Sequence, residues 1–382
     1  MIRHLLVLNN GSSSLKFAVF AVDKKLSKQV LSGSFSLLGN KSVLSYKLGL
    51  KKFKINYQSA YDLSAWWKNL IPVLAKFDIS YLGFRMVHGG EEFIDTAKID
   101  NNFLNKIKKY KSLAPLHNPY TLELIDLAKK TWPRAKMAVS FDTAWYKDMP
   151  IAAYLYSIPI KYYQNFAIRK YGFHGLSHEA ATIYTAKILG KKLSELKLIT
   201  CHLGSGSSLT WYMDGKVKDT TMGFSPNEGL TMATRSGDLP ASIIFYLYRE
   251  LKIPLNKIED IINNESGLLG LSGLADLREV MLSAGYKVAD YKSSFKFSKE
   301  QRKASKLALD VYIYDIRRYL ASYLAMSKKI DAIVFTGAVG ANNKIRSLVL
   351  KGVNIPKNTK IIFAPEGEIK NLAEKTLRCL MK

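Results

Sequence analysis

Cysteine is nearly absent from this chain of 382 residues. Only Cys201 and Cys379 occur, and neither has the neighbours of a metal-binding set, so both are expected to be reduced structural thiols. No run of 18 apolar residues occurs, and Met1 leads directly into an apolar stretch. Neither a transmembrane helix nor a signal peptide is therefore predicted, and we expect a cytoplasmic protein with no membrane partner.

Acidic residues are also scarce, with 31 Asp and Glu against 57 Lys and Arg, for a net charge of +26. Such a balance would suit a nucleic-acid partner, which would show as salt-sensitive retention of duplex or single strands. The lysines are scattered, however, and no aromatic-and-basic recognition motif or long basic tail is present. We favour a solvated basic surface that attracts anionic substrates and expect no nucleic-acid partner.

A Walker-type phosphate loop is missing as well, because the nearest candidate, residues 33–41, lacks both the spacing and the Gly-Lys pair. The chain is longer than the size at which single cores stop growing, so two domains are predicted.

Two Gly/Ser corners carry the strongest signal. Residues 6–17 read LVLNNGSSSLKF and residues 197–212 read KLITCHLGSGSSLTWY, so that each is an apolar run, a polar corner and a resumed strand. Ser13-Ser14-Leu15 matches Ser207-Ser208-Leu209 at an offset of 194 residues, about half the chain. Hydroxyls and backbone N–H groups at a tight corner suit phosphate. One such corner is usually a plain turn. Two in matching contexts favour two related lobes that hold a nucleotide in a cleft between them.

The remaining pattern alternates strands and helices. Residues 17–22, 31–37 and 43–55 predict an antiparallel meander, and a strand at 81–88 and another at 138–141 follow helical stretches. Ser177 is expected to cap a helix that ends at Gly190. A helix is predicted to start at Asn118-Pro119, with Asn as its N-cap, and to lead into residues 122–131. Further helices are predicted at residues 62–77, 299–327 and 369–380, and further strands at 332–335 and 361–363.

Five of the six histidines lie in loops marked by Gly or Pro, where sites are commonly built. His174 and His178 have the spacing of a helical zinc pair, but Gly175 lies between them and the metalloprotease glutamate is missing, which argues against zinc. We expect His174 to donate to a transferring phosphoryl group. His178 is expected to pack against or cap the following helix.

Arginine and carboxylate residues complete the candidate chemistry. Arg85 and Arg235 lie in glycine-marked segments, and a guanidinium fork matches carboxylate and phosphate oxygens. Asp142 ends a predicted strand and could orient an arginine or hold magnesium through water, and Glu368 is a second candidate for the metal environment. Magnesium is expected because phosphoryl transfer from a nucleotide needs its charge neutralised.

These residues together resemble the acetate kinase family, short-chain carboxylate kinases of the acetate and sugar kinase/Hsp70/actin superfamily. The resemblance rests on NNGSSSLK, RMVHGG, APLHNP, FDTAWY, YGFHGLSHE, HLGSGSSL, EGLTMATRSGD and ESGLLGLSG, in this order. It implies an α/β fold of two duplicated actin-like, ribonuclease H-like lobes, with mixed five-stranded sheets, flanking helices and a cleft between them. The expected lobes are residues 1–141 with 370–382, on the acid and phosphate side, and residues 142–369, on the nucleotide and dimerisation side.

The resemblance also implies an activity: reversible, magnesium- or manganese-dependent, in-line transfer of the γ-phosphoryl group of ATP to acetate by a homodimer. Its implied catalytic residues are Arg85, Asp142, His174 and Arg235, and its implied metal residues are Asn9 and Glu368. The acid would be bound by Arg85 and an apolar pocket of Val87, Leu116, Phe173 and Pro226. The phosphate and nucleotide side would comprise Ser12, Ser14, Lys16, His202, Leu203, Gly204, Ser205, Gly206, Asp276, Leu277, Arg278, Ala338, Val339 and Gly340.

The departures from the family pattern cluster on the nucleotide side. Ser205 replaces an asparagine, Ala338 a glycine, Ala341 a glutamate and Gly367 the first of two adjoining glutamates, and SGDLP is one residue shorter than usual. A phosphoryl donor other than ATP therefore stays open as a hypothesis. So do propionate or butyrate as the acid, since one methylene discriminates by only about 1–3 kcal/mol. A nucleotide-binding module of the actin/Hsp70 kind without transferase activity is the alternative from another class.

Overall fold

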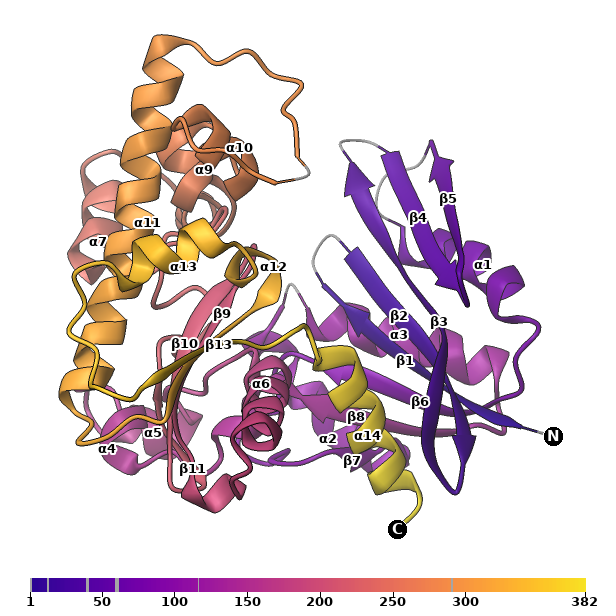
Figure 1. Ribbon diagram of the computed structural model, residues 1–382. Coiled ribbons are helices and arrows are strands. Elements are labelled where there is room, and N and C mark those ends of the chain that lie inside the picture. The colour runs from indigo at the N-terminus through magenta and orange to yellow at the C-terminus, as the bar shows by residue number, and fades with distance from the viewer. Residues whose placement is uncertain (1, 12–13, 39–40, 59–61, 116, 290) are drawn as a thin grey trace. The chain divides into compact units, whose positions relative to one another are not determined.

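The computed structural model describes residues 2–11, 14–38, 41–58, 62–115, 117–289 and 291–382 (Figure 1). The chain forms two compact units, here called unit 1 (Met1–Lys147 with Gly367–Lys382) and unit 2 (Asp148–Glu366). Each has its own sheet and its own hydrophobic core, and each is described by itself.

Unit 1 is built on an eight-stranded sheet in the order β5-β4-β3-β2-β1-β6-β8-β7. The strands from β5 to β1 form an antiparallel meander, whereas β6 and β8 run parallel to β1. The strands are β1 (Arg3–Asn10), β2 (Ser14–Asp23), β3 (Lys25–Leu38), β4 (Lys41–Leu48), β5 (Lys51–Tyr57), β6 (Ile79–Met86), β7 (Ala97–Lys98) and β8 (Lys136–Phe141), and the helices are α1 (Leu63–Leu74), α2 (Asn101–Ile107), α3 (Asn118–Thr131) and α14 (Glu368–Leu380).

Helices cover both faces of this sheet, which explains why the centre of β1 is an unbroken apolar run rather than an alternating one. On one face Trp66 of α1 stacks on Phe35 of β3 at 5.1 Å between ring centroids. On the other face α14 approaches β6 closely, because Gly83 has no side chain: a Cβ there would lie 2.3 Å from Thr376 Oγ1.

Unit 2 is built on a five-stranded sheet in the order β11-β10-β9-β12-β13. Alternation along β9 assigns the two faces: Ile199 and Cys201 belong to the core that contains α11, whereas Thr200 faces α6. The strands are β9 (Lys197–Leu203), β10 (Ser207–Met213), β11 (Lys216–Thr220), β12 (Ala332–Thr336) and β13 (Lys360–Phe363). The helices are α4 (Ile151–Tyr154), α5 (Lys161–Phe166), α6 (Gly175–Leu189), α7 (Ala241–Arg249), α8 (Leu255–Asp260), α9 (Gly267–Ser272), α10 (Leu277–Ser283), α11 (Lys299–Ala325), α12 (Gly337–Gly340) and α13 (Asn343–Leu350).

The two sheets repeat one plan. Three antiparallel strands are followed by two parallel ones in β3-β2-β1-β6-β8 and again in β11-β10-β9-β12-β13. The Gly/Ser corners occupy the same place in both, between the first and second strands of each repeat. The predicted α/β fold of two duplicated lobes is thus confirmed. Five strands is too few for unit 1, because β4 and β5 extend the meander and β7 adds an edge.

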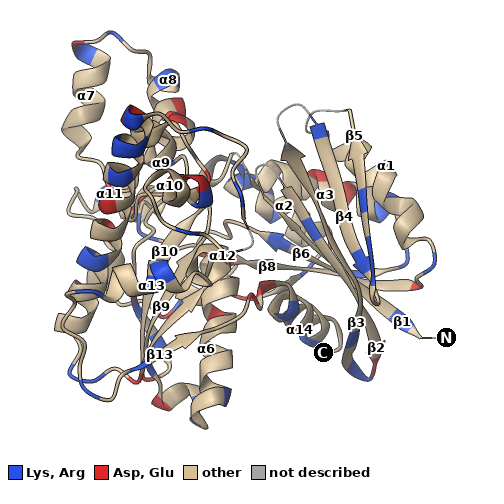
Figure 2. Ribbon diagram, turned by 45° about the horizontal axis from the view of Figure 1, so that its top comes forward, with Lys and Arg blue, Asp and Glu red and all other residues tan. Residues whose placement is uncertain are grey.

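Basic residues are spread over helices and strands of both units (Figure 2). Within the described ranges, no helix combines the length and the hydropathy needed to span a bilayer.

Candidate active site

The corner of unit 2 brings together two of the predicted catalytic residues. Leu203 and Ser207 close the hairpin as paired residues, and Gly204 N–H donates to Gly206 O at 3.0 Å. A Cβ on Gly206 would lie 2.9 Å from Arg235 Nη2 and 3.0 Å from His174 Nε2. Both side chains therefore pack against the backbone at Gly206, and glycine is what gives them the space.

Arg235 lies in the long loop that follows β11, and hydrogen bonds within this loop hold its side chain. Its Nη1 donates to the carbonyl oxygen of Pro226 at 2.6 Å, and Ala233 N–H donates to Ser205 O at 3.1 Å. The loop is thereby tied both to itself and to the corner, and Pro226, predicted to line the acid pocket, is a direct neighbour of the guanidinium.

A second contact holds the same loop near its start. Tyr156 OH donates to the carboxylate of Glu228 at 2.7 Å, and Phe224 N–H donates to Tyr156 OH at 2.7 Å. Burial, followed by the charge of Glu228, raises the pKa of Tyr156 above its ordinary value, so the phenol stays protonated and can donate. These positioning contacts were not predicted, because the residues lie far apart in the sequence.

His174 is the N-cap residue of α6 and has the left-handed backbone conformation, with φ 57° and ψ 22°. Its Nδ1 lies 2.9 Å from Ser208 Oγ, and its ring lies 4.3 Å from that of His202 between centroids. The expected cap was wrong: Ser177 is inside α6, and its Oγ contacts His202 Nδ1 at 2.8 Å. The predicted closure of this helix by Gly190 is confirmed, with φ 63°.

The other predicted nucleotide residues lie on α10 and α12. Gly337 begins α12 with φ 83° and packs so closely on β9 that a Cβ would lie 2.5 Å from Leu203 O, which places Ala338, Val339 and Gly340 beside the corner. Asp276 is the N-cap residue of α10, whose first residue is Leu277. Its carboxylate forms an ion pair with Arg278 at 2.5 Å.

In unit 1, Arg85 and Asp142 form one ion pair. Arg85 Nη2 lies 2.5 Å from Asp142 Oδ2, and Arg85 Nη1 donates to Asn10 O at 3.2 Å. Asp142 is fully buried. Burial alone would lower the pKa of Arg85, but the charge and hydrogen bond of Asp142 raise it above its ordinary value. Asp142 therefore holds the guanidinium charged at the ends of β6 and β8.

The described residues that were predicted to bind metal and phosphate lie around the C-terminal end of β1. Asn9 Nδ2 donates to Glu368 Oε1 at 3.0 Å, so the strand end meets the start of α14. Gly11 N–H donates to Ser14 O at 2.7 Å, and Lys16 is paired with Asn9 across the hairpin. Predicted residues Ser12 and Leu116 lie outside the described residues.

The amide of Asn9 and the carboxylate of Glu368 fit magnesium in kind, since that ion takes oxygen ligands and keeps several waters and phosphate oxygens. Among the described residues no group of three or more His, Cys, Asp or Glu could hold a metal ion. If Asn9 and Glu368 held the ion, waters and phosphate oxygens would supply its other ligands.

His88 and Val87 form a buried turn after β6. Asn118 brackets this turn: its Oδ1 accepts from His88 N–H at 3.2 Å, and its Nδ2 donates to His88 O at 2.9 Å. His88 Nδ1 accepts from Gly90 N–H at 3.0 Å, which places the proton of the neutral ring on Nε2.

His88 should make folding sensitive to acid. Burial lowers its pKa from 6.5 to about 3, so below pH 6.5 the unfolded chain binds a proton that the folded chain does not. The free energy of unfolding therefore falls as the pH falls from 6.5 towards 3. His88→Asn keeps an acceptor for Gly90, so between pH 6.5 and 5 wild type should lose about 1.6 kcal/mol more than this variant in urea titrations. Equal pH slopes for the two proteins would contradict the assignment.

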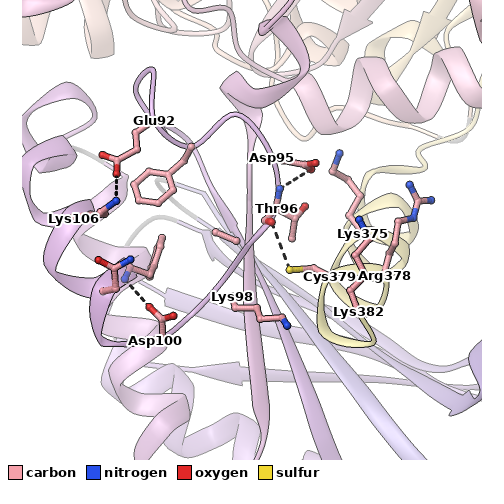
Figure 3. Close-up of a pocket in the computed structure, with 14 residues that line it drawn as sticks. Glu92, Asp95, Thr96, Lys98, Asp100, Lys106, Lys375, Arg378, Cys379 and Lys382 are labelled. Carbon is pink, nitrogen blue, oxygen red and sulfur yellow. Dashed lines mark hydrogen bonds and ion pairs between the residues drawn. The ribbon is translucent and has the colours of Figure 1, made fainter.

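One cavity of about 670 Å³ lies elsewhere in unit 1, between the segment from Glu92 to Lys106 and the C-terminal half of α14 (Figure 3). Its acids are engaged within the fold: Glu92 pairs with Lys106 at 2.7 Å, and Asp100 caps α2. No predicted site residue lines this cavity, so it is separate from the candidate active site.

Comparison with known proteins decides the family. Residues 4–356 match the model of the acetokinase family. The chain belongs to the acetokinase family. An acetate kinase from Clostridium novyi is 35% identical over 99% of this chain and 96% of its own, and one from Thermoanaerobacter pseudethanolicus is 39% identical over 91% and 86%. A propionate kinase from Francisella tularensis has a similar structure, with a TM-score of 0.85, 32% identity and coverage of 99% and 100%.

The recognised family agrees with the resemblance stated from the motifs. Within unit 1 the structure brings together Asn9 with Glu368 and Arg85 with Asp142, and within unit 2 it brings together His174, Gly206 and Arg235. The roles of these acetokinase residues remain predictions. What sequence reasoning missed is the set of partners that orient them, in particular Ser208.

Proposed function

We propose that this acetokinase family member is a cytoplasmic acetate kinase, which transfers the γ-phosphoryl group of ATP reversibly to acetate to give acetyl phosphate and ADP. The observation that supports it most is the glycine corner, where a guanidinium and an imidazole both reach the backbone at Gly206. Anionic phosphoryl oxygens need such donors.

The reaction needs little covalent help from the protein. A carboxylate oxygen of acetate forms a bond to the γ-phosphorus, while the bond from that phosphorus to the β–γ bridging oxygen breaks and its electron pair leaves with ADP. Acetate is already ionised at neutral pH, so no general base is required. In this proposal Arg85 binds the acid, Arg235 and His174 stabilise the moving charge, and Asp142 keeps Arg85 oriented. Positioning and electrostatic stabilisation then supply the rate.

Magnesium or manganese would be held by Asn9 and Glu368. When bound, such an ion neutralises phosphate charge. Unit 1 would thus serve the acid and metal, with Ser12, Ser14 and Lys16 on the phosphate. Unit 2 would bind the nucleotide through the segments of His202–Gly206, Asp276–Arg278 and Ala338–Gly340.

A matrix of donors and acids tests the proposal. Acyl phosphate trapped as hydroxamate should form with ATP and acetate and require a divalent cation, and GTP and pyrophosphate should be compared because Ser205 and Ala338 depart from the family pattern. Product with another donor alone would correct the nucleotide. No acyl phosphate with any donor would favour a nucleotide-binding module instead.

Val87 offers a test of acid size. It is 3% exposed and next to His88, and it is one of the four residues predicted to line the apolar pocket for the acid. Val87→Ala should raise kcat/KM for propionate and butyrate relative to acetate about 10-fold, because the added space admits a further methylene. An unchanged ratio across the three acids would remove Val87 from the pocket.

We propose a homodimer formed through unit 2. None of the residues of α7 is buried, and three of them are large aromatic residues. Phe245, Tyr246 and Tyr248 are 53%, 59% and 50% exposed. An apolar patch of this kind marks an interface. Light scattering should therefore give twice the 43.0 kDa of one chain, and Phe245→Asp should give monomers. Phe295→Asp, on a loop Phe that is 62% exposed, is the matched control and should stay dimeric.

A further inference from the structure

A chain of buried hydrogen bonds runs behind His174. His178 and Ser208 are both 0% exposed. His178 Nδ1 lies 2.6 Å from Thr200 Oγ1, its Nε2 lies 2.8 Å from Ser208 Oγ, and Ser208 Oγ lies 2.9 Å from His174 Nδ1. Ser208 is thus a single hydroxyl between two imidazole rings.

Local geometry explains the meeting. His174 is the N-cap residue of α6, and its carbonyl oxygen accepts from His178 N–H at 3.0 Å, so the two residues lie one turn apart. Ser208 of β10 is paired with His202 of β9, and Thr200 is two residues earlier on the same face of the sheet. The helix therefore sets two rings against two hydroxyls of the neighbouring strands.

Counting hydrogens gives the direction of these bonds. Thr200 Oγ1 donates to Thr210 O at 3.4 Å, so it accepts from His178 Nδ1–H. Burial, then the charge of His202, lowers the pKa of His178 well below 6.5, so its ring is neutral and Nε2 accepts. Ser208 has one hydrogen, which it gives to that nitrogen. His174 Nδ1 must then donate to Ser208. If every bond of the chain ran the other way, Thr200 would give its one hydrogen to His178 Nδ1, and its bond to Thr210 O would be lost.

We propose that Ser208 and His178 are positioning residues for His174, which fix its ring and hold a proton on Nδ1, so that Nε2 is the atom presented at Gly206 and becomes the donor to the phosphoryl group when the ring takes up a second proton. The inference rests on the proposed function of His174. It assigns Ser208 to the imidazole rather than to the nucleotide. Nε2 is also the ring nitrogen that lies 3.0 Å from a Cβ on Gly206, on the same side as Arg235.

The tautomer can be measured without activity. Long-range proton–nitrogen correlation on protein labelled with ¹⁵N-histidine, assigned with His174→Gln and recorded where the ring is neutral, should show a protonated Nδ1 on His174. Ser208→Ala should shift this signature towards a protonated Nε2. Ser177→Ala is the matched control, because Ser177 contacts His202, and it should change the His202 signals alone. His174 signals that are the same in wild type and Ser208→Ala would overturn the proposal.

A kinetic cycle tests the same link in the working enzyme. Ser208→Ala should lower kcat about 10- to 100-fold with little change in KM for ATP, and Ser208→Thr, which keeps a hydroxyl, should recover part of the loss. In a His174→Gln background the Ser208→Ala substitution should change kcat less than about 2-fold, since its effect passes through the missing ring. If the two substitutions lowered kcat independently, so that their effects multiplied in the double variant, Ser208 would act on the nucleotide and not through His174. A change in KM for ATP with kcat unaltered would lead to the same conclusion. If the wild-type enzyme were inactive with every donor, the proposed function would be wrong. The tautomer measurement needs no activity, so it would still decide whether Ser208 and His178 position His174.

Discussion

Replacing Arg235 with alanine is expected to lower kcat about a thousand-fold while unit 2 stays folded. The guanidinium lies beside His174 at the Gly206 corner, where its charge would meet the transferring phosphoryl group. An arginine in that role is worth about 10³–10⁵ in rate. Unit 2 should stay folded, because the hydrogen bond from Arg235 Nη1 to the Pro226 carbonyl, a bond from a charged donor, is worth only about 1.5–3 kcal/mol. Initial rates with saturating ATP and acetate, together with thermal unfolding, measure both effects.

Arg317 of α11 supplies the matched control. It too is part-buried and donates to one backbone carbonyl, that of Leu348, but it lies outside the predicted site residues. Arg317→Ala should therefore keep kcat within about 2-fold of wild type, as expected for a substitution away from the reacting groups. Arg235→Lys should fall between alanine and wild type, because a lysine keeps the charge and loses the fork. Near-normal turnover in Arg235→Ala would remove this residue from the phosphoryl site.

The duplicated fold could be predicted from the sequence because it depends on local signals. The two Gly/Ser corners fix where each hairpin turns, and apolar runs beside them fix the central strands. The strand count of unit 1 could not be predicted in the same way, because the predicted strand region 43–55 divides into β4, which is partly buried beside β3, and β5, an exposed edge strand that pairs only with β4. The start of α6 at His174, in place of the expected cap at Ser177, could not be predicted for a different reason. A left-handed histidine is rare, and here a contact with Ser208, 34 residues away, accompanies it.

The candidate site shows the same division. Residue type and loop position single out Arg85, Asp142 and His174, since few side chains can bind phosphate or carboxylate. Their partners are another matter, because Arg85 meets Asp142 over 57 residues and His178 meets Ser208 over 30. A sequence shows that Ser208 is polar in a buried strand, but only the fold shows that two histidines share its hydroxyl.

Replacing Arg85 with alanine is expected to cost stability as well as rate. Asp142 is 0% exposed, and its partner lies at 2.5 Å, so the alanine variant leaves a buried carboxylate without its guanidinium. Breaking a buried pair from one side typically costs about 3–5 kcal/mol. The free energy of unfolding of unit 1, measured in urea, should fall by this amount, and kcat should fall by orders of magnitude because the acid loses its binding fork.

The double variant Arg85→Met with Asp142→Leu separates the two effects. Apolar side chains of similar volume remove both charges together, so most of the lost stability should return, as it does when a buried ion pair is replaced as a whole. Activity should not return, since Arg85, the residue proposed to bind the carboxylate of the acid, would be missing. If Arg85→Ala were as stable as wild type, Asp142 would have to be compensated by other groups. If the stable double variant were active, the pair would serve the fold alone, and the acid would have to be bound by unit 2.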